Sequence, residues 1–367
     1  MNVAILGYGT VGSGVFEVLR MNHDYIEKSA GVPLDVKYVL DLRDFPGDPV
    51  MDVLVHDFNL ILEDPEVDVV AEVMGGIHPA YDFTKAALER GKAVCTSNKE
   101  LVAKHGAELI ELAKEKNTNY FFEASVGGGI PIIRPLNRSL TADDILEIKS
   151  IINGTTNYIL TQMSANGASF DDALRDAQAK GFAERNPAAD IEGMDASRKT
   201  AILSSLVNGR QVEVDDIYTE GITKITADDI AYAQAFGYCI KLLSVVKRSG
   251  GKTYALVAPH LVAPECPLYN VNGVFNGICV IGNAVGELMF YGSGAGKLPT
   301  ASAVVGDVVE AAKHRHINVV TIWEKEPMKI EAFEDMTNSF FVRVPISMKE
   351  QAKELFEIRE AMEEFRP

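Results

Sequence analysis

Two side chains of opposite charge lie four residues apart at the start of a predicted helix. Asp195 and Lys199 share one face of that helix, because residues at i and i+4 are neighbours on a helix surface. A lysine ammonium beside an aspartate can give a proton to an oxygen atom, as the reduction of a carbonyl requires when hydride reaches the carbon. The same spacing is found in ordinary helical ion pairs and N-caps, so the pair by itself leaves both interpretations open.

The loop before this helix is rich in acidic side chains. Glu184 and Asp190 lie in it, and carboxylates in such a loop could hold the ammonium group of a small polar substrate.

The N-terminal segment has the pattern of a dinucleotide-binding turn. It matches G-x-G-x-x-G and lies between an apolar run and a stretch with helical spacing. There the glycines allow a tight turn, and backbone N–H groups at the helix start can hold a pyrophosphate. A plain glycine turn is the alternative. The residues expected to contact the cofactor are Gly7, Gly9, Thr10, Val11 and Gly12.

The residues after the second predicted strand bear on the choice of cofactor. Asp41 is placed to hold the ribose hydroxyls of NAD, whereas Arg43 could meet the 2′-phosphate of NADP. The pair indicates NAD with a slight preference over NADP, and both residues could also be surface charges.

Three further segments could complete the site. Lys99 follows the end of a predicted strand, where ligands of open parallel sheets bind, and could orient a carbonyl substrate or the nicotinamide; a surface lysine is the alternative. The turn Asn153–Asn157 fits either an N-cap or a substrate-binding loop. The glycine-rich segment Gly292–Gly296 is either a second backbone contact to the cofactor or a flexible hinge.

Composition excludes several classes of function. A net charge of -17 argues against general nucleic-acid binding, which needs a basic face. No apolar run approaches the ~20 residues of a membrane helix, and no signal peptide is visible. The cysteines are widely spaced without a CxxC pair, which fits free thiols in a reducing compartment. We therefore expect a cytoplasmic protein, with a buried, inert thiol at Cys95; the other cysteines are Cys239, Cys266 and Cys279.

Predicted strands and helices alternate from the N-terminus, which indicates an α/β protein with a Rossmann-type, doubly wound parallel sheet. This first domain covers residues 1–136 and is completed by a helical pattern at about 297–315. An α+β domain follows at 137–296, and a C-terminal extension covers 316–367.

Several separated segments match one family in their order and spacing. Over about residues 1–315 the chain resembles homoserine dehydrogenase, and its Asn-Gly-Thr-Thr-Asn-Tyr segment and acidic loop are specific to that family. The matching segments are Gly7–Gly12, Thr96–Lys99, Glu123–Pro131, Asn153–Leu160, Glu184–Lys199 and Gly292–Asp307.

The resemblance implies reversible reduction of L-aspartate 4-semialdehyde to L-homoserine with NAD or NADP, on the route to threonine and methionine. It implies that the α+β domain serves catalysis and dimerisation, in a homodimer or homotetramer. By position, Lys199 is the family's catalytic lysine and Asp195 its partner, while Lys99 contacts both substrate and cofactor.

The resemblance also assigns binding roles. Glu184 and Asp190 bind the amino end of the substrate, Gly154 and Thr155 line its pocket, and Gly296 is the late contact to the cofactor. Backbone carbonyls and one carboxylate would hold a structural Na⁺ ion, and the residues that match this site are Glu123, Val126, Gly128 and Ile130.

The C-terminal extension departs from the family pattern. It is too long for a bare catalytic core and too short for a full ACT regulatory domain. A predicted strand at Ser339–Val344 and a predicted amphipathic helix at Lys349–Phe365 resemble the first two elements of an ACT domain. The segment between them lacks the expected Asp-x-Pro-Gly turn, which argues against threonine feedback and makes subunit association an equal alternative.

Two other functions compete with this interpretation. An aldehyde-oxidising semialdehyde dehydrogenase would share the glycine turn but needs a catalytic cysteine, and no cysteine here has a matching context. A dinucleotide-binding redox sensor would not need the cluster from Glu184 to Lys199.

Overall fold

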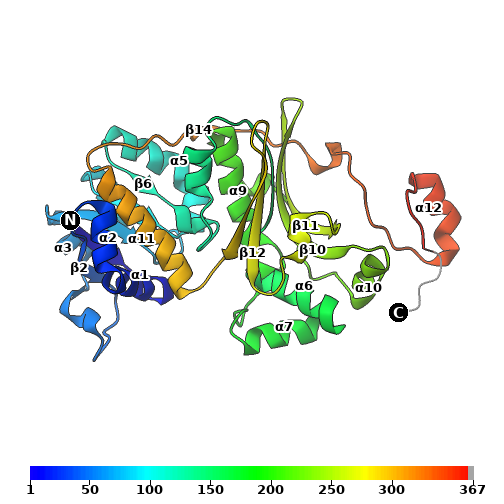
Figure 1. Ribbon diagram of the computed structural model, residues 1–367, viewed down its shortest axis with the longest axis horizontal. Coiled ribbons are helices and arrows are strands. Elements are labelled where there is room, and N and C mark those ends of the chain that lie inside the picture. The colour runs from blue at the N-terminus through cyan, green and yellow to red at the C-terminus, as the bar shows by residue number, and fades with distance from the viewer. Residues whose placement is uncertain (363–367) are drawn as a thin grey trace.

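The computed structural model describes residues 1–362 and has two α/β units side by side along its long axis (Figure 1). The first unit contains the N-terminus and a parallel sheet. The second contains a mixed sheet with helices packed against it.

The first sheet is parallel, and its strand order is β3-β2-β1-β4-β5-β6. Its central strands are apolar runs because helices cover both faces of a parallel sheet. The order reverses between β1 and β4, and in such sheets ligands bind at this switch point. The strands are β1 (Asn2–Leu6), β2 (Asp35–Leu40), β3 (Leu54–Val55), β4 (Val67–Glu72), β5 (Ala93–Thr96) and β6 (Tyr120–Phe121).

Helices from both ends of the chain cover this sheet. The late helix α11 lies along α1, as Figure 1 shows, and apolar residues of both helices belong to one buried cluster. The chain therefore returns to its first unit after building the second. The helices of this unit are α1 (Thr10–Met21), α2 (His23–Ala30), α3 (Phe58–Glu63), α4 (Ala80–Glu89), α5 (Lys99–Glu115) and α11 (Lys297–Lys313).

The second sheet has the order β13-β12-β7-β10-β11-β9 and is antiparallel except where β9 joins β11. Helices α6 and α9 pack on it, and Thr200 of α9 shares a 2.6 Å hydrogen bond with Ser244 of β10. The strands are β7 (Ile145–Ile151), β9 (Tyr218–Thr219), β10 (Cys239–Ser249), β11 (Lys252–Val262), β12 (Phe275–Gly282) and β13 (Gly286–Ser293). The helices are α6 (Gly154–Asn166), α7 (Phe170–Ala179), α8 (Ala188–Ile191), α9 (Met194–Asn208) and α10 (Ala227–Ala235).

The two units meet where α5 packs against α9. Arg198 of α9 pairs with Glu100 of α5 at 3.5 Å, and the Gln211 side chain donates to the Ala103 carbonyl at 3.0 Å. This junction brings the start of α5 close to the start of α9, which are the two helix ends that carry the predicted lysines.

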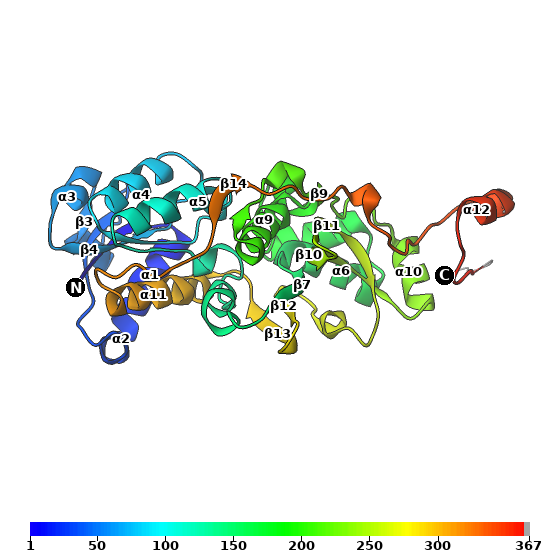
Figure 2. The ribbon, with the colours of Figure 1, turned by 90° about the horizontal axis from the view of Figure 1, so that it is seen from above.

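Residues 316–348, which we call the C-terminal strap, cross both units (Figure 2). Strand β14 (Glu324–Pro327) of the strap pairs with β8 (Arg210–Gln211). Trp323 is 4% exposed and packs against Gly106 of α5, while its indole N–H donates to the Gln211 side chain at 2.9 Å. Farther along, Phe333 stacks on Tyr218. One buried indole therefore contacts both units.

The end of the chain differs from the prediction. Ser339–Val344 does not form a strand, and helix α12 (Lys349–Leu355) ends well before Phe365, a residue that lies outside the described part of the chain. Alternating apolar residues form a strand only when a neighbouring strand accepts their backbone hydrogen bonds. Phe340, Val342 and Val344 are exposed and have no such neighbour among residues 1–362.

The alternation of strands and helices and the parallel sheet predicted for the first domain are confirmed. All four cysteines are free, and Cys95 is fully buried in β5, as predicted. Within residues 1–362, no helix is long and apolar enough to cross a membrane.

Replacing Trp323 by alanine tests the strap. Because the side chain is buried between the two units, Trp323→Ala should lower the free energy of unfolding by about 3 kcal/mol, the loss typical of a large aromatic truncation. Urea unfolding followed by far-UV circular dichroism measures this change. Val320→Ala, at an exposed strap position, is the control and should leave the midpoint unchanged. Equal midpoints for the two variants would contradict a tight strap.

Candidate active site

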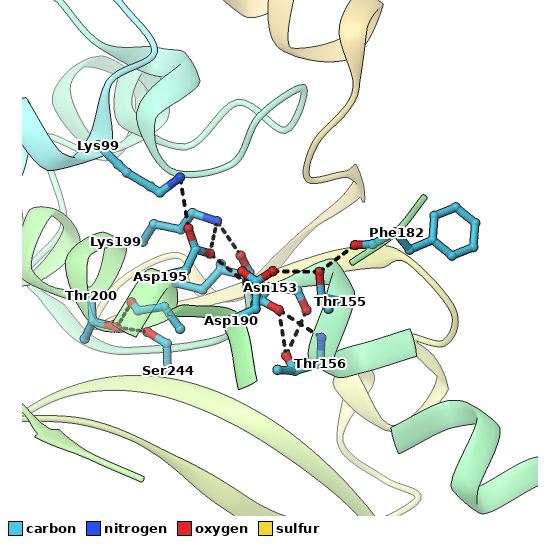
Figure 3. A network of polar contacts seen from close by, with 12 residues as sticks. Lys99, Asn153, Thr155, Thr156, Phe182, Asp190, Asp195, Lys199, Thr200 and Ser244 are labelled. Carbon is cyan, nitrogen blue, oxygen red and sulfur yellow. Dashed lines mark hydrogen bonds and ion pairs between the residues drawn. The ribbon is translucent and has the colours of Figure 1, made fainter. Parts of the chain in front are cut away.

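Two lysines from different units contact one buried aspartate (Figure 3). The Lys199 ammonium donates to Asp195 Oδ2 at 2.7 Å, and the Lys99 ammonium lies 3.0 Å from Asp195 Oδ1. Lys199 also donates to the Ile152 carbonyl at 2.8 Å. The predicted pair on α9 is therefore formed, and the start of α5 supplies a second cation to it.

The two ammonium groups stabilise the negative charge of Asp195. Burial by itself would raise the pKa of Asp195, which is only 6% exposed. The ammonium groups of Lys199 and Lys99 outweigh burial and hold the pKa of that carboxyl well below its usual range. Asp195 is therefore ionised at neutral pH and fixes the positions of both ammonium groups.

An asparagine joins this aspartate to the acidic loop. The Asn153 amide donates to Asp190 Oδ1 at 2.8 Å and to Asp195 Oδ2 at 2.9 Å. The side-chain oxygen Oδ1 of Asn153 accepts from the Thr156 N–H at 2.9 Å and caps α6. Thr155 Oγ1 lies 3.0 Å from Asp190 Oδ2. The turn before α6 is thus an N-cap and also part of the polar network.

The glycine turn leads directly from β1 into α1. Gly12 allows this close packing, because a Cβ there would lie 1.9 Å from the Gly7 carbonyl oxygen. The N-cap Gly9 has no side chain over the first turn of α1, so the backbone N–H groups there can face a phosphate. Gly296 is the N-cap of α11 and lies beside α1, where Lys297 pairs with Glu17 at 2.6 Å.

Two family profiles match most of the chain. The profile of the homoserine dehydrogenase NAD-binding domain matches residues 7–123, and that of homoserine dehydrogenase matches residues 131–309. A homoserine dehydrogenase from Helicobacter pylori is 42% identical over 349 residues, which cover 95% of this chain and 82% of the relative. The chain belongs to the homoserine dehydrogenase family.

Other homoserine dehydrogenases agree with this assignment. The Bacillus subtilis protein is 42% identical over 87% of this chain and 74% of its own length. A crystal structure from Thiobacillus denitrificans superposes with a TM-score of 0.84 at 40% identity, over 90% of this chain and 78% of that one. The protein is an NAD(P)-dependent oxidoreductase of this family.

Glu184, which the family resemblance assigns to the substrate, lies apart from the polar network around Asp195. It is exposed, and its backbone carbonyl accepts from the Gln178 side chain. Among the described residues no hydrogen bond joins its carboxylate to Asp190, Asp195 or Lys199. Its role in substrate binding stays a prediction.

Asp41 and Arg43 bind each other at the end of β2. The Arg43 guanidinium contacts both Asp41 oxygens, at 2.9 and 3.0 Å, and the Tyr8 N–H of the glycine turn donates to Asp41 Oδ2 at 2.8 Å. The Arg43 guanidinium holds the pKa of Asp41 well below its usual range. The acid and the base predicted for the ribose end of the cofactor thus form one unit.

Glu123 uses its carboxylate inside the protein. Oε1 accepts from the N–H groups of Ile132 and Ile133 at 2.5 and 2.8 Å, and Oε2 accepts from the Arg134 N–H at 2.7 Å. Three of the acceptor positions of this carboxylate are thus taken by backbone N–H groups, and its role as a sodium ligand stays a prediction. The backbone carbonyls of this loop are the other ligands expected there, and they stay a prediction as well.

Asn153 is the site residue that sequence reasoning described only as part of a turn. Exchanging its amide for a carboxylate keeps the cap of α6 but turns a shared donor into a negative charge beside two others. We expect Asn153→Asp to lower kcat/KM by roughly 100-fold, the effect of replacing a charge-assisted hydrogen bond by repulsion. Steady-state kinetics measure the change.

The matched control is Asn166→Asp, at an exposed position near the end of the same helix. It adds the same charge and should keep normal kinetics. An Asn153→Asp protein with unchanged kinetics would show that the amide does not organise the site.

Proposed function

We propose that this protein interconverts L-homoserine and L-aspartate 4-semialdehyde, with Lys199 as the proton-transfer residue. The observation that supports this most is the convergence of Lys99 and Lys199, from two separate units, on the buried Asp195. A pair of fixed ammonium groups at the junction of a nucleotide-binding unit and an acidic loop suits a substrate with both an oxygen to protonate and an amino group to hold.

The two lysines divide the work at the substrate oxygen. NAD(P)H held at the glycine turn would supply the hydride for reduction, and NAD(P)⁺ held there would accept it in the reverse reaction. Lys199 gives the aldehyde oxygen its proton during reduction and takes the hydroxyl proton during oxidation. Asp195 keeps the Lys199 ammonium in place, and Lys99 adds positive charge where negative charge develops.

The acidic loop binds the other end of the substrate. Asp190 is held by Asn153 and Thr155 and offers its carboxylate to the substrate ammonium group. Gly154, between these two residues at the start of α6, lines the substrate pocket with its backbone. Glu184, exposed on the same loop, is a second carboxylate for this ammonium group. Much of the rate enhancement then comes from positioning.

For the cofactor we propose a preference for NAD. Asp41 is tied to the glycine turn through the Tyr8 N–H, and ribose hydroxyls would take the place of its contacts with the Arg43 guanidinium. Arg43, which lies beside it, gives NADP a second route by contacting a 2′-phosphate. An NADPH complex is known for a mutant of a hyperthermophilic archaeal homoserine dehydrogenase, which is 30% identical to this chain.

We also propose that the protein works as a homodimer or homotetramer. The edge strand β13 supports this, because Tyr291 on it is exposed and stacks on exposed Phe275 of β12. We propose that a structural Na⁺ ion binds at Glu123, Val126, Gly128 and Ile130, as the family resemblance implies.

The competing functions have less support. A semialdehyde dehydrogenase needs an accessible thiolate, but Cys95 is fully buried and burial raises its pKa well above the usual value. A sensor that only binds dinucleotide would have no use for two lysines that converge on the buried Asp195.

Lys199→Met tests the proposed chemistry. Removing the proton donor should lower kcat for L-homoserine oxidation at alkaline pH by about 10²- to 10⁴-fold while leaving dinucleotide binding intact. Absorbance of the reduced cofactor measures turnover, with NAD and NADP in parallel. Lys104→Met, an exposed change on α5, is the control and should keep full activity. Absence of turnover in the folded wild-type protein with either cofactor would contradict the substrate assignment.

Arg43→Ala tests the cofactor proposal. Loss of the guanidinium should lower kcat/KM with NADP by about tenfold, the size of one charged hydrogen bond to a phosphate. The value with NAD should change little, because Asp41 remains, and it serves as the internal control. Equal losses with both dinucleotides would contradict a role for Arg43 at the 2′ position.

A further inference from the structure

Lys241 of β10 is a buried cation that the proposed chemistry does not use. Lys241 is only 3% exposed. Its ammonium group donates to the Val271 carbonyl at 2.6 Å, to Asn272 Oδ1 at 2.8 Å and to Asn157 Oδ1 at 3.2 Å. No carboxylate within residues 1–362 forms an ion pair with it. Three neutral oxygens thus match the three N–H donors of the ammonium group.

Burial makes the charged form of the Lys241 side chain less favourable. A buried ammonium group loses its hydration, and burial lowers the pKa of Lys241. A lysine in this position acts as a tethered monovalent cation that draws carbonyl oxygens together. The use of a charged group where an apolar side chain would fill the space indicates that the position of these oxygens matters.

Two of these oxygens, those of Val271 and Asn272, belong to a loop, residues 271–275, and the third, Asn157 Oδ1, belongs to helix α6, so Lys241 joins the loop to the helix. The Asn157 amide donates to the Val271 carbonyl at 3.1 Å and to the Phe275 carbonyl at 3.0 Å. Thr161 Oγ1 accepts from the Gly273 N–H at 3.1 Å. Lys241, Asn157 and Thr161 therefore join the loop to the first two turns of α6.

The fastened loop lies directly against the first residue of α6. A Cβ on Gly154 would lie 2.8 Å from the Val274 carbonyl oxygen, so the backbones of the loop and of Gly154 are in close contact. Gly154 stands between Asn153 and Thr155, the two residues that hold Asp190. A shift of the loop would therefore move the groups that orient the acidic side of the site.

We propose that Lys241 is a positioning residue for the amino acid substrate, which fixes the 271–275 loop and through it the Asn153–Thr155 turn. This rests on the proposed function, because it assigns the substrate's ammonium group to Asp190. Lys241 touches neither the substrate nor the cofactor, so its effect is on substrate KM and much less on the dinucleotide.

The chain offers a matched control for removing this lysine. Lys92 is also buried, and its ammonium also donates to backbone carbonyls, those of Asp64 at 2.6 Å and Val67 at 3.1 Å. It lies just before β5, at the amino end of the parallel strands and away from the edge where ligands bind. A purely structural buried lysine is expected to behave like Lys92.

Lys241→Ala and Lys92→Ala are compared in the full-length enzyme by steady-state kinetics and thermal unfolding. Lys241→Ala should raise the KM for L-homoserine by about tenfold and leave the KM for NAD within about twofold, as expected for one lost charged hydrogen-bonding group. Lys92→Ala should lower the melting temperature without changing either KM. Ammonium or methylammonium chloride, added against a sodium chloride control, should fill the oxygen-lined space in Lys241→Ala and lower its KM for homoserine again.

The outcomes separate this proposal from the proposed function. No homoserine oxidation by the wild-type protein would remove the function itself, whereas a Lys241→Ala enzyme with wild-type KM for homoserine overturns only the role of Lys241. An equal rise in both KM values, or an equal rise in Lys92→Ala, also overturns it. If Lys241→Ala does not fold, Asn272→Ala removes one exposed acceptor and should raise the KM for homoserine in the same direction; an unchanged KM there overturns the proposal.

Discussion

The site depends on one carboxylate shared by two ammonium groups that come from different units. Asp195 sits at the start of α9 and Lys99 at the start of α5, so their contact exists only when the parallel-sheet unit and the mixed-sheet unit are docked. The docking of α5 on α9 is therefore part of the chemistry. Burial of Asp195 strengthens its contacts with both ammonium groups, since a fully exposed ion pair is screened by water. Burial also makes the loss of either partner costly, since a buried charge without its partner is strongly destabilising.

The link between the units is built to hold one geometry. Glu123 accepts three backbone N–H groups at the point where the chain leaves the first sheet. Asp307 of α11 accepts from the Glu123 N–H at 2.8 Å and from the Arg134 guanidinium at 2.8 Å. A helix that returns late in the chain thereby fixes the segment that enters the second unit. Hydrogen bonds to buried carboxylates are among the stronger ones in proteins, which suits a linker that must not bend freely.

Local patterns predicted what depends on local forces. The glycine turn, the strand–helix alternation and the Asp195–Lys199 pair all follow from spacing along the chain. The contact of Lys99 with Asp195 follows from docking, and Asn153 looked like an N-cap because its amide has partners only in the fold. The strand expected at Ser339–Val344 failed for the opposite reason, since its alternation is correct but no neighbouring strand pairs with it. Strand β14, charged and short, gave no such pattern and forms because β8 is beside it.

The strap gives the protein a built-in optical probe. Trp323 is the sole tryptophan of the chain, and its indole is sealed between α5, Phe122 and the Gln211 side chain. Its emission therefore reports one place, the seam between the two units, with no second tryptophan to obscure the signal. Any change in the angle between the units alters the packing and hydration of that ring. Movement of the two units on ligand binding can thus be followed by the fluorescence of the unlabelled protein. Emission that does not change when ligands bind would indicate a rigid enzyme whose site is already assembled.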